Sequence, residues 1–153
     1  MIPKFRAWDP LNKMMITNFY RSYVHTERGR FSYKLATVNG NEIKATAYVN
    51  SLESLIYKYS HDLILMQSTG LKDKNGVEIF EGDVCNLSGG LDDYWYIVEW
   101  LFAGRQLVTY KKPDAKVSGI SDGINQCYLE PSIASNLGID GNIHENPELL
   151  SNP

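Results

Sequence analysis

Residues that could bind a metal are scattered along this chain of 153 residues. No two of His25, His61 and His144 lie three or four residues apart with a carboxylate partner, which is the spacing of helical zinc sites. Asp73 begins a segment that looks like the start of a calcium loop. However, glycine stands at its fourth position instead of its sixth, and Val84 replaces the glutamate of position twelve. We therefore expect no metal site, and we interpret this segment as a hairpin turn.

Nucleophilic chemistry has no sequence support either. The chain contains no Gly-x-Ser-x-Gly elbow, and neither Cys85 nor Cys127 stands in a pattern typical of an activated thiolate. Asp92 and Asp93 are adjacent, so they would point to opposite faces of a strand or be solvated in a turn. Gly89-Gly90 lacks the spacing of a phosphate-binding loop. We expect a protein that is not an enzyme, uses no cofactor and carries two free thiols.

Aromatic and basic residues alternate at two points near the N-terminus, Phe5-Arg6-Ala7-Trp8 and Tyr20-Arg21-Ser22-Tyr23. Surfaces that stack nucleic-acid bases show this alternation, and a cross-strand aromatic core would explain it equally. Residues 1–34 hold seven Lys and Arg against two Asp and Glu, whereas the rest of the chain holds eight against sixteen. A nucleic-acid patch, complementary faces and chance segregation all remain open. The candidate partner-binding residues of this region are Arg6, Trp8, Arg21 and Tyr23.

A second candidate surface is the predicted strand at residues 94–100. Its two faces are both largely apolar, with Tyr94, Tyr96, Val98 and Trp100 on one face and Trp95 and Ile97 on the other. A strand of this kind is central in a sheet or lies in an interface. Trp95 and Trp100 are therefore further candidate partner-binding residues. Because the halves of the chain also carry opposite charge, we expect self-association.

The elements that would position these residues are mostly strands. Alternation and turn residues predict a β-meander with strands at 3–8, 14–20, 23–26, 31–38 and 41–49. Asn39-Gly40 is the strongest hairpin signal in the meander. One short helix is predicted at about 50–60, because apolar residues recur at helical spacing, namely Leu52, Leu55, Ile56 and Tyr59.

The second half is organised around the stretch Leu63–Leu87. It reads as an apolar strand, a turn at Asn75-Gly76, a short strand, a turn at Glu81-Gly82-Asp83 and a third strand. Strands at 94–100, 106–110 and 139–143 would complete a small barrel or sandwich, with a surface loop at 111–125 and a helical turn at 146–150. We therefore predict a β-rich region with a short helix at 1–60 and a small β-barrel domain at 61–153.

Three blocks of the sequence together resemble the YopX-like family of phage and prophage proteins. They are Lys4-Phe5-Arg6-Ala7-Trp8-Asp9, the segment from Gln67 to Val84, and Gly141-Asn142-Ile143-His144-Glu145-Asn146-Pro147-Glu148-Leu149. Ser68 and His144 depart from the family pattern, which has aromatic residues at these positions. The resemblance implies a phage or prophage origin, a mainly β fold with a small SH3-like barrel in the second half, and oligomerisation. It supplies no activity and no catalytic residues.

The sequence also bears on the compartment. No apolar run approaches the roughly 20 residues that span a bilayer, and the N-terminus lacks the apolar core of a signal peptide. We expect a cytoplasmic, non-enzymatic protein that self-associates and binds a host or phage protein, without contact to a membrane. The alternative is a nucleic-acid-binding accessory protein that uses the basic N-terminal third.

Overall fold

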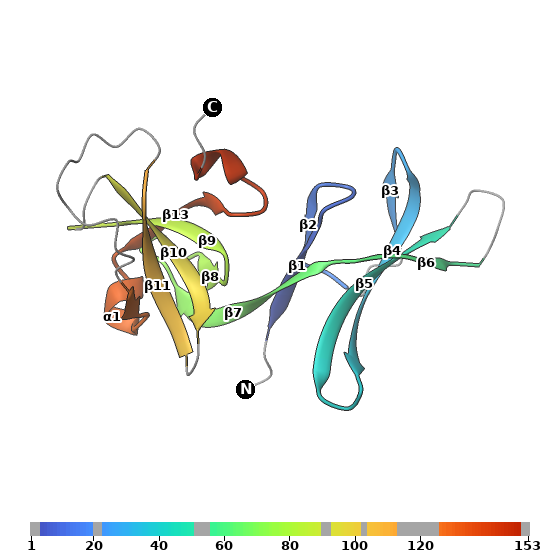
Figure 1. Ribbon diagram of the computed structural model, residues 1–153, viewed down its shortest axis with the longest axis horizontal. Helices are drawn as coiled ribbons and strands as arrows, with labels where there is room; N and C mark the ends of the chain where they lie inside the picture. Colours follow the sequence, from blue (N-terminus) through green and yellow to red (C-terminus); the bar gives the residue numbers. More distant parts are fainter. Residues whose placement is uncertain are drawn as a thin grey trace. The chain divides into compact units, whose positions relative to one another are not determined.

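The computed structural model describes residues 4–19, 23–50, 56–89, 93–101, 104–112 and 126–150, most of which lie in antiparallel strands (Figure 1). The mainly β fold predicted from sequence is confirmed. The chain divides into two compact units. We call Phe5–Met66 the N-terminal unit, and Met1–Lys4 together with Gln67–Pro153 the C-terminal unit.

The N-terminal unit begins with a hairpin of β1 (Phe5–Asp9) and β2 (Met14–Ile16). A four-stranded sheet follows, with its strands in the order β3-β4-β5-β6. These strands are β3 (Val24–Thr26), β4 (Gly29–Val38), β5 (Glu42–Asn50) and β6 (Lys58–Asp62). Asn39 and Gly40, between β4 and β5, both have positive φ, at 51° and 85°. The predicted meander and its Asn-Gly turn are confirmed.

One face of this sheet carries the core of the N-terminal unit. The register places Phe31 opposite Val49 and Tyr33 opposite Ala47, so the side chains of these pairs share a face. Phe31 and Tyr33 are buried on it, at 1% and 3% exposure. The full cluster consists of Ala7, Ile16, Phe31, Tyr33, Ala45, Ala47 and Leu63.

The helix predicted at about 50–60 is wrong where the structure describes this segment. β5 continues to Asn50, β6 begins at Lys58, and residues 51–55 lie outside the described part of the chain. Ile56 and Tyr59, which were expected on the apolar face of the helix, are 69% and 61% exposed. Tyr59 instead lies opposite Tyr48 of β5. From Lys58 onward, pairing with the edge of β5 therefore outweighs the helical periodicity.

The C-terminal unit is built on a five-stranded antiparallel sheet in the order β12-β11-β10-β9-β13. The strands are β9 (Asp83–Leu87), β10 (Tyr94–Leu101), β11 (Gly104–Lys111), β12 (Gln126–Tyr128) and β13 (Leu137–Asn142). The sheet curls into a half-barrel, which confirms the predicted small barrel. A register shift between Ile139 and Gly141 helps to bend β13.

The remaining elements connect or cover these strands. β7 (Ile64–Lys72) starts in the N-terminal unit and continues into the C-terminal unit, where it pairs with β8 (Glu78–Phe80). A short helix, α1 (Pro131–Ala134), precedes β13, and the 3-10 turn η1 (Pro147–Leu149) follows it. The helical turn predicted at 146–150 is confirmed, with Pro147 at its start. Residues 113–125 of the predicted loop lie outside the described residues.

The core of the C-terminal unit lies on one face of the five-stranded sheet and under α1. It consists of Ile79, Cys85, Tyr96, Val98, Leu129, Ala134 and Leu137. Cys85 is a buried free thiol. Its pKa is raised mainly by burial and, to a smaller extent, by the negative charge of nearby carboxylates. Across the described ranges, no helix has both the length and the apolar character needed to cross a membrane.

Candidate functional site

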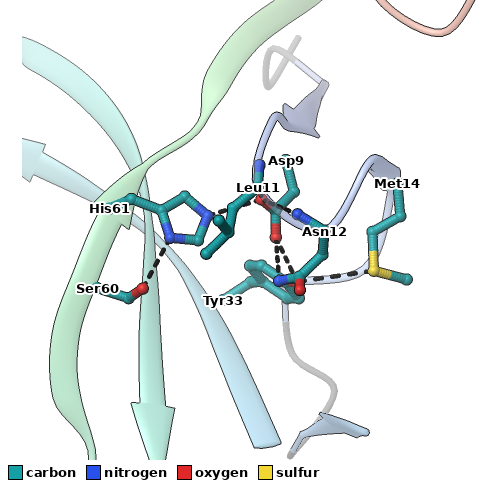
Figure 2. Close-up of polar contacts among 7 residues, drawn as sticks. All are labelled: Asp9, Leu11, Asn12, Met14, Tyr33, Ser60 and His61. Carbon is teal, nitrogen blue, oxygen red and sulfur yellow. Dashed lines mark hydrogen bonds and ion pairs between the residues drawn. The ribbon is translucent and has the colours of Figure 1, made fainter. Parts of the chain in front are cut away.

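A buried carboxylate, Asp9, lies at the centre of a polar cluster in the N-terminal unit (Figure 2). Its Oδ1 accepts hydrogen bonds from the backbone amides of Leu11 and Asn12, at 2.9 and 3.1 Å. Its Oδ2 accepts from Asn12 Nδ2 at 2.8 Å and from the Tyr33 hydroxyl at 2.7 Å. The side chain of Asp9 thus closes the turn between β1 and β2 that its own Asp-Pro sequence begins.

His61 joins a second strand to this carboxylate. Its Nε2 lies 2.6 Å from Asp9 Oδ1, and its Nδ1 lies 2.8 Å from Ser60 Oγ (Figure 2). Serine, histidine and aspartate also form the hydrogen-bonded chain of hydrolytic triads. A hydroxyl can donate to a ring nitrogen or accept from it, so His61 keeps both contacts in its neutral and its protonated form. These contacts tie β6 to the β1–β2 turn.

The protonation of the cluster follows from its burial and its donors. Burial alone would raise the pKa of Asp9, but the hydrogen bonds from Tyr33, Asn12 and His61 together outweigh it and hold the pKa below its ordinary value. Burial and the neighbouring Asp9 carboxylate raise the pKa of Tyr33, so its hydroxyl remains a donor. Both carboxylate oxygens of Asp9 accept hydrogen bonds, and the side chain is not exposed to solvent. This arrangement suits the stabilisation of a turn.

A second buried carboxylate, Asp73, stabilises the turn between β7 and β8. Its Oδ1 accepts from the backbone amides of Asn75 and Val77, at 2.8 and 2.9 Å. Its Oδ2 accepts from the amide of Ile139 at 3.2 Å, which links the turn to β13. The segment that resembles a calcium loop is therefore a hairpin turn in which backbone donors occupy the carboxylate. No group of three or more acidic, histidine or cysteine side chains suited to a metal occurs among the described residues.

The third buried carboxylate, Asp83, starts β9. Its Oδ2 accepts from the backbone amide of Phe80 at 2.8 Å. Asn142, also buried, accepts from the amide of His144 at 2.9 Å and donates to Asp83 Oδ1 at 3.5 Å. All three sequence blocks that resemble the YopX-like family thus contain buried polar residues that hold turns together.

The predicted partner-binding residues of the N-terminal unit have different environments. Trp8 is buried at 9% exposure and belongs to the core, and Arg6 is half-buried. Arg21 lies outside the described residues. Tyr23 is 40% exposed, and the Arg30 Cζ atom lies 5.6 Å from the centroid of its ring. Among the three described candidates, Tyr23 is therefore exposed, Arg6 is partly accessible and Trp8 is buried.

The predicted residues of the C-terminal unit both lie on β10. Trp95 donates from Nε1 to the Leu149 carbonyl at 2.9 Å, and Lys112 Nζ lies 4.2 Å from its ring centroid. Trp95 thus fastens the C-terminal 3-10 turn to the sheet. Trp100 is 47% exposed at the end of the strand.

The outer face of the four-stranded sheet carries aromatic residues that sequence reasoning did not group. Tyr48 of β5 lies opposite Ser32 of β4 and Tyr59 of β6, and the two tyrosine rings are 6.4 Å apart. Val24 of β3 lies opposite Phe31 of β4, so Tyr23, which precedes Val24, lies next to Ser32 on the same face as Tyr48. We call Tyr23, Tyr48 and Tyr59 the tyrosine row. Alternation within β5 signals the polar face, but the strand order is needed to assemble the row.

Two cations flank the tyrosine row. Arg30 lies beside Tyr23, and Lys34 Nζ lies 5.2 Å from the ring centroid of Tyr48. Within the described part of the chain, neither cation forms a salt bridge. The Tyr59 hydroxyl donates to Asp62 at 3.1 Å, and this hydrogen bond raises the pKa of Tyr59. The row therefore places phenol rings next to two positively charged side chains.

Comparisons with known proteins identify relatives of the whole chain. A family model described as YopX protein matches residues 4–151. The crystal structure of protein EF1440 from Enterococcus faecalis is similar, with 26% sequence identity, a TM-score of 0.52 and 99% of each chain covered. No curated protein matches this chain. Because the family match extends over nearly all of its length, the chain belongs to the YopX family.

Proposed function

We propose that this protein is a non-enzymatic, phage- or prophage-encoded interaction protein of the bacterial cytoplasm that binds further copies of itself. The observation that carries the proposal is the outer half of the β4–β5 hairpin, residues 35–44, which we call the hairpin arm. β3 pairs with β4 only as far as Phe31, and β6 pairs with β5 only from Thr46 onward. The arm is therefore a two-stranded ribbon in the described part of the N-terminal unit (Figure 1).

The apolar face of the hairpin continues from the core onto the arm. Leu35 follows Phe31 and Tyr33 at alternate positions of β4, and it lies opposite Ala45. Ile43 precedes Ala45 by two residues on β5 and shares the same face. Leu35 and Ile43 are 36% and 37% exposed, whereas Tyr33 and Ala45, the next residues inward on this face, are buried. A two-stranded ribbon is marginally stable alone, and a partner that covers this face would stabilise it.

Charge supports a second copy as that partner. The N-terminal unit holds eight Lys and Arg against five Asp and Glu, and the C-terminal unit holds seven against thirteen. The basic arm-bearing unit of one copy is therefore complementary to the acidic unit of another. Contacts of this kind are heterologous, and they form a closed ring when the rotation between copies closes. A host or phage protein with an acidic surface would bind the arm by the same chemistry.

Sedimentation velocity over a range of protein and salt concentrations tests this proposal. We expect the wild-type chain to form oligomers at micromolar concentration, and the variant Ile43→Asp to be monomeric. The matched control Ala36→Asp places the same charge on the opposite face of the same arm, and it should retain the oligomer. Circular dichroism verifies that both variants fold. A wild-type chain that stays monomeric throughout would overturn the proposal.

A second candidate function is nucleic-acid binding through the basic N-terminal third. It is favoured by Arg30 and Lys34, two cations beside tyrosine rings that form no salt bridge among the described residues. Retention of mixed DNA and RNA fragments on immobilised protein at low salt tests it, because phosphate attraction is strongest there. Failure to retain either nucleic acid would exclude this function.

A further inference from the structure

We propose that the outer face of the four-stranded sheet binds single-stranded nucleic acid. The tyrosine row would stack on the bases, while Arg30 and Lys34 would contact the phosphates. This inference deepens the second candidate function, on which it rests, because it names the form of nucleic acid and the residues that contact it.

The geometry of the row suits base stacking. Neighbouring strands of a sheet lie about 4.8 Å apart, and Tyr48 on β5 packs edge to face against Tyr59 on β6, with the two ring planes at 79°. Tyr23 and Tyr48 stand on either side of Ser32, a small residue, and two strand spacings of about 10 Å separate them. Tyr23 and Tyr59 are 40% and 61% exposed. The face therefore presents two exposed rings, Tyr23 and Tyr59, on which bases could stack.

The charge of the face favours a polyanion. Arg30, Lys34 and Lys44 share the outer face of β4 and β5, because Arg30 and Lys34 alternate along β4 and Lys44 lies opposite Ala36. No salt bridge involves any of the three within the described ranges. Among the described residues of β4, β5 and β6, the acidic side chains on this face are Glu42 and Asp62, and the Asp62 carboxylate accepts a hydrogen bond from the Tyr59 hydroxyl.

Core packing does not explain these tyrosines. Phe31 and Tyr33, which alternate with Arg30 and Ser32 along β4, point to the opposite face and form the core there. The tyrosine row lies on the solvent side, where an exposed ring gains little from burial. Bases in a duplex are already stacked inside the helix, so only unpaired bases can reach the rings. Every base has a π face, and stacking on exposed aromatics is therefore tolerant of sequence.

Fluorescence anisotropy with labelled oligo(dT), oligo(U) and a duplex of equal length tests the inference. We expect both single strands to bind and the duplex to bind at least tenfold more weakly. Tyr59→Ser should raise Kd for the single strands about fivefold or more, whereas Tyr59→Phe, which keeps the ring, should not. Lys34→Glu should weaken binding and lower the slope of log Kd against log salt by about 0.7.

The matched control is Lys13→Glu, which makes the same charge change in the β1–β2 turn. That turn contacts Tyr33 through Asn12, so it belongs to the core side of the sheet. We expect Lys13→Glu to leave affinity unchanged. Three results would overturn the inference and still leave general nucleic-acid binding supported. They are equal affinity for duplex and single strands, an unchanged Kd for Tyr59→Ser, or equal losses of affinity for Lys13→Glu and Lys34→Glu. Failure of every probe to bind at low salt would overturn both.

Discussion

Replacing the buried Asp9 with alanine should destabilise the N-terminal unit severely. The substitution removes the acceptor of two backbone amides, the Asn12 side chain, the Tyr33 hydroxyl and His61. A buried donor left without a partner costs about 1–3 kcal/mol. Tyr33 is 3% exposed and cannot recover the bond from water, whereas the amides of the turn are only partly buried.

The expected loss for Asp9→Ala is about 3–5 kcal/mol of unfolding free energy, a large share of the roughly 5–15 kcal/mol typical of a domain. Asp9→Asn should cost less, about 1–2 kcal/mol, because it keeps one oxygen acceptor. The Oδ1 atom of Asn12 is buried without a hydrogen-bond partner. It could accept from the new amide if the Asn12 side chain turned around.

Urea unfolding followed by circular dichroism measures these losses. The control is Asp62→Ala, which removes an exposed carboxylate next to His61 and should change stability by less than about 0.5 kcal/mol. A loss below about 1 kcal/mol for Asp9→Ala would refute the reasoning, since the five donors would then have found other partners at little cost.

The same carboxylate should make stability sensitive to acid. The pKa of Asp9 in the folded protein lies below its ordinary value of 3.8. The unfolded chain therefore binds the proton more readily, and the stability that Asp9 contributes is present above about pH 4 and is lost as the pH falls through the folded pKa. We expect the curve of stability against pH to be flatter below pH 4 for Asp9→Asn than for the wild type.

Three further predictions concern the C-terminal unit. Asp73→Ala should lower the unfolding free energy by about 2–4 kcal/mol in urea titrations, because three backbone amides lose their acceptor. Gly141→Ala should lower the melting temperature, because its new Cβ would lie 2.7 Å from Asn146 Oδ1. That oxygen already accepts a hydrogen bond from the backbone amide of Asn142. An unchanged melting temperature would show that the Asn146 side chain moves freely. In a Cys127→Ser background, Cys85 should react with a thiol reagent only after unfolding, because burial raises its pKa and encloses it; rapid labelling of the native protein would contradict this.

Turns were predictable from sequence because their backbone conformation depends on neighbouring residues. Asn39-Gly40 adopts the positive φ angles that its residue types tolerate, and Pro147 starts a helical turn as its fixed φ favours. At Asn75-Gly76 only Gly76 has a positive φ, so the turn type differs from the simplest Asn-Gly hairpin although its position is as predicted. Alternation likewise predicted the mainly β fold.

Tertiary structure decided which of these residues meet. Asp9 and His61 are separated by 52 positions, and Asp73 and Ile139 by 66, so their contacts depend on strand order that local patterns do not encode. The last part of the predicted helical segment, from Lys58, instead belongs to β6, which pairs with the edge of β5 and so places Tyr59 beside Tyr48. Trp8 and Trp100 looked alike in sequence, yet one is buried in a core and the other is exposed at a strand end. Adjacent residues determine the local backbone conformation, whereas the burial of a side chain and the tyrosine row depend on the pairing of strands that are distant in sequence.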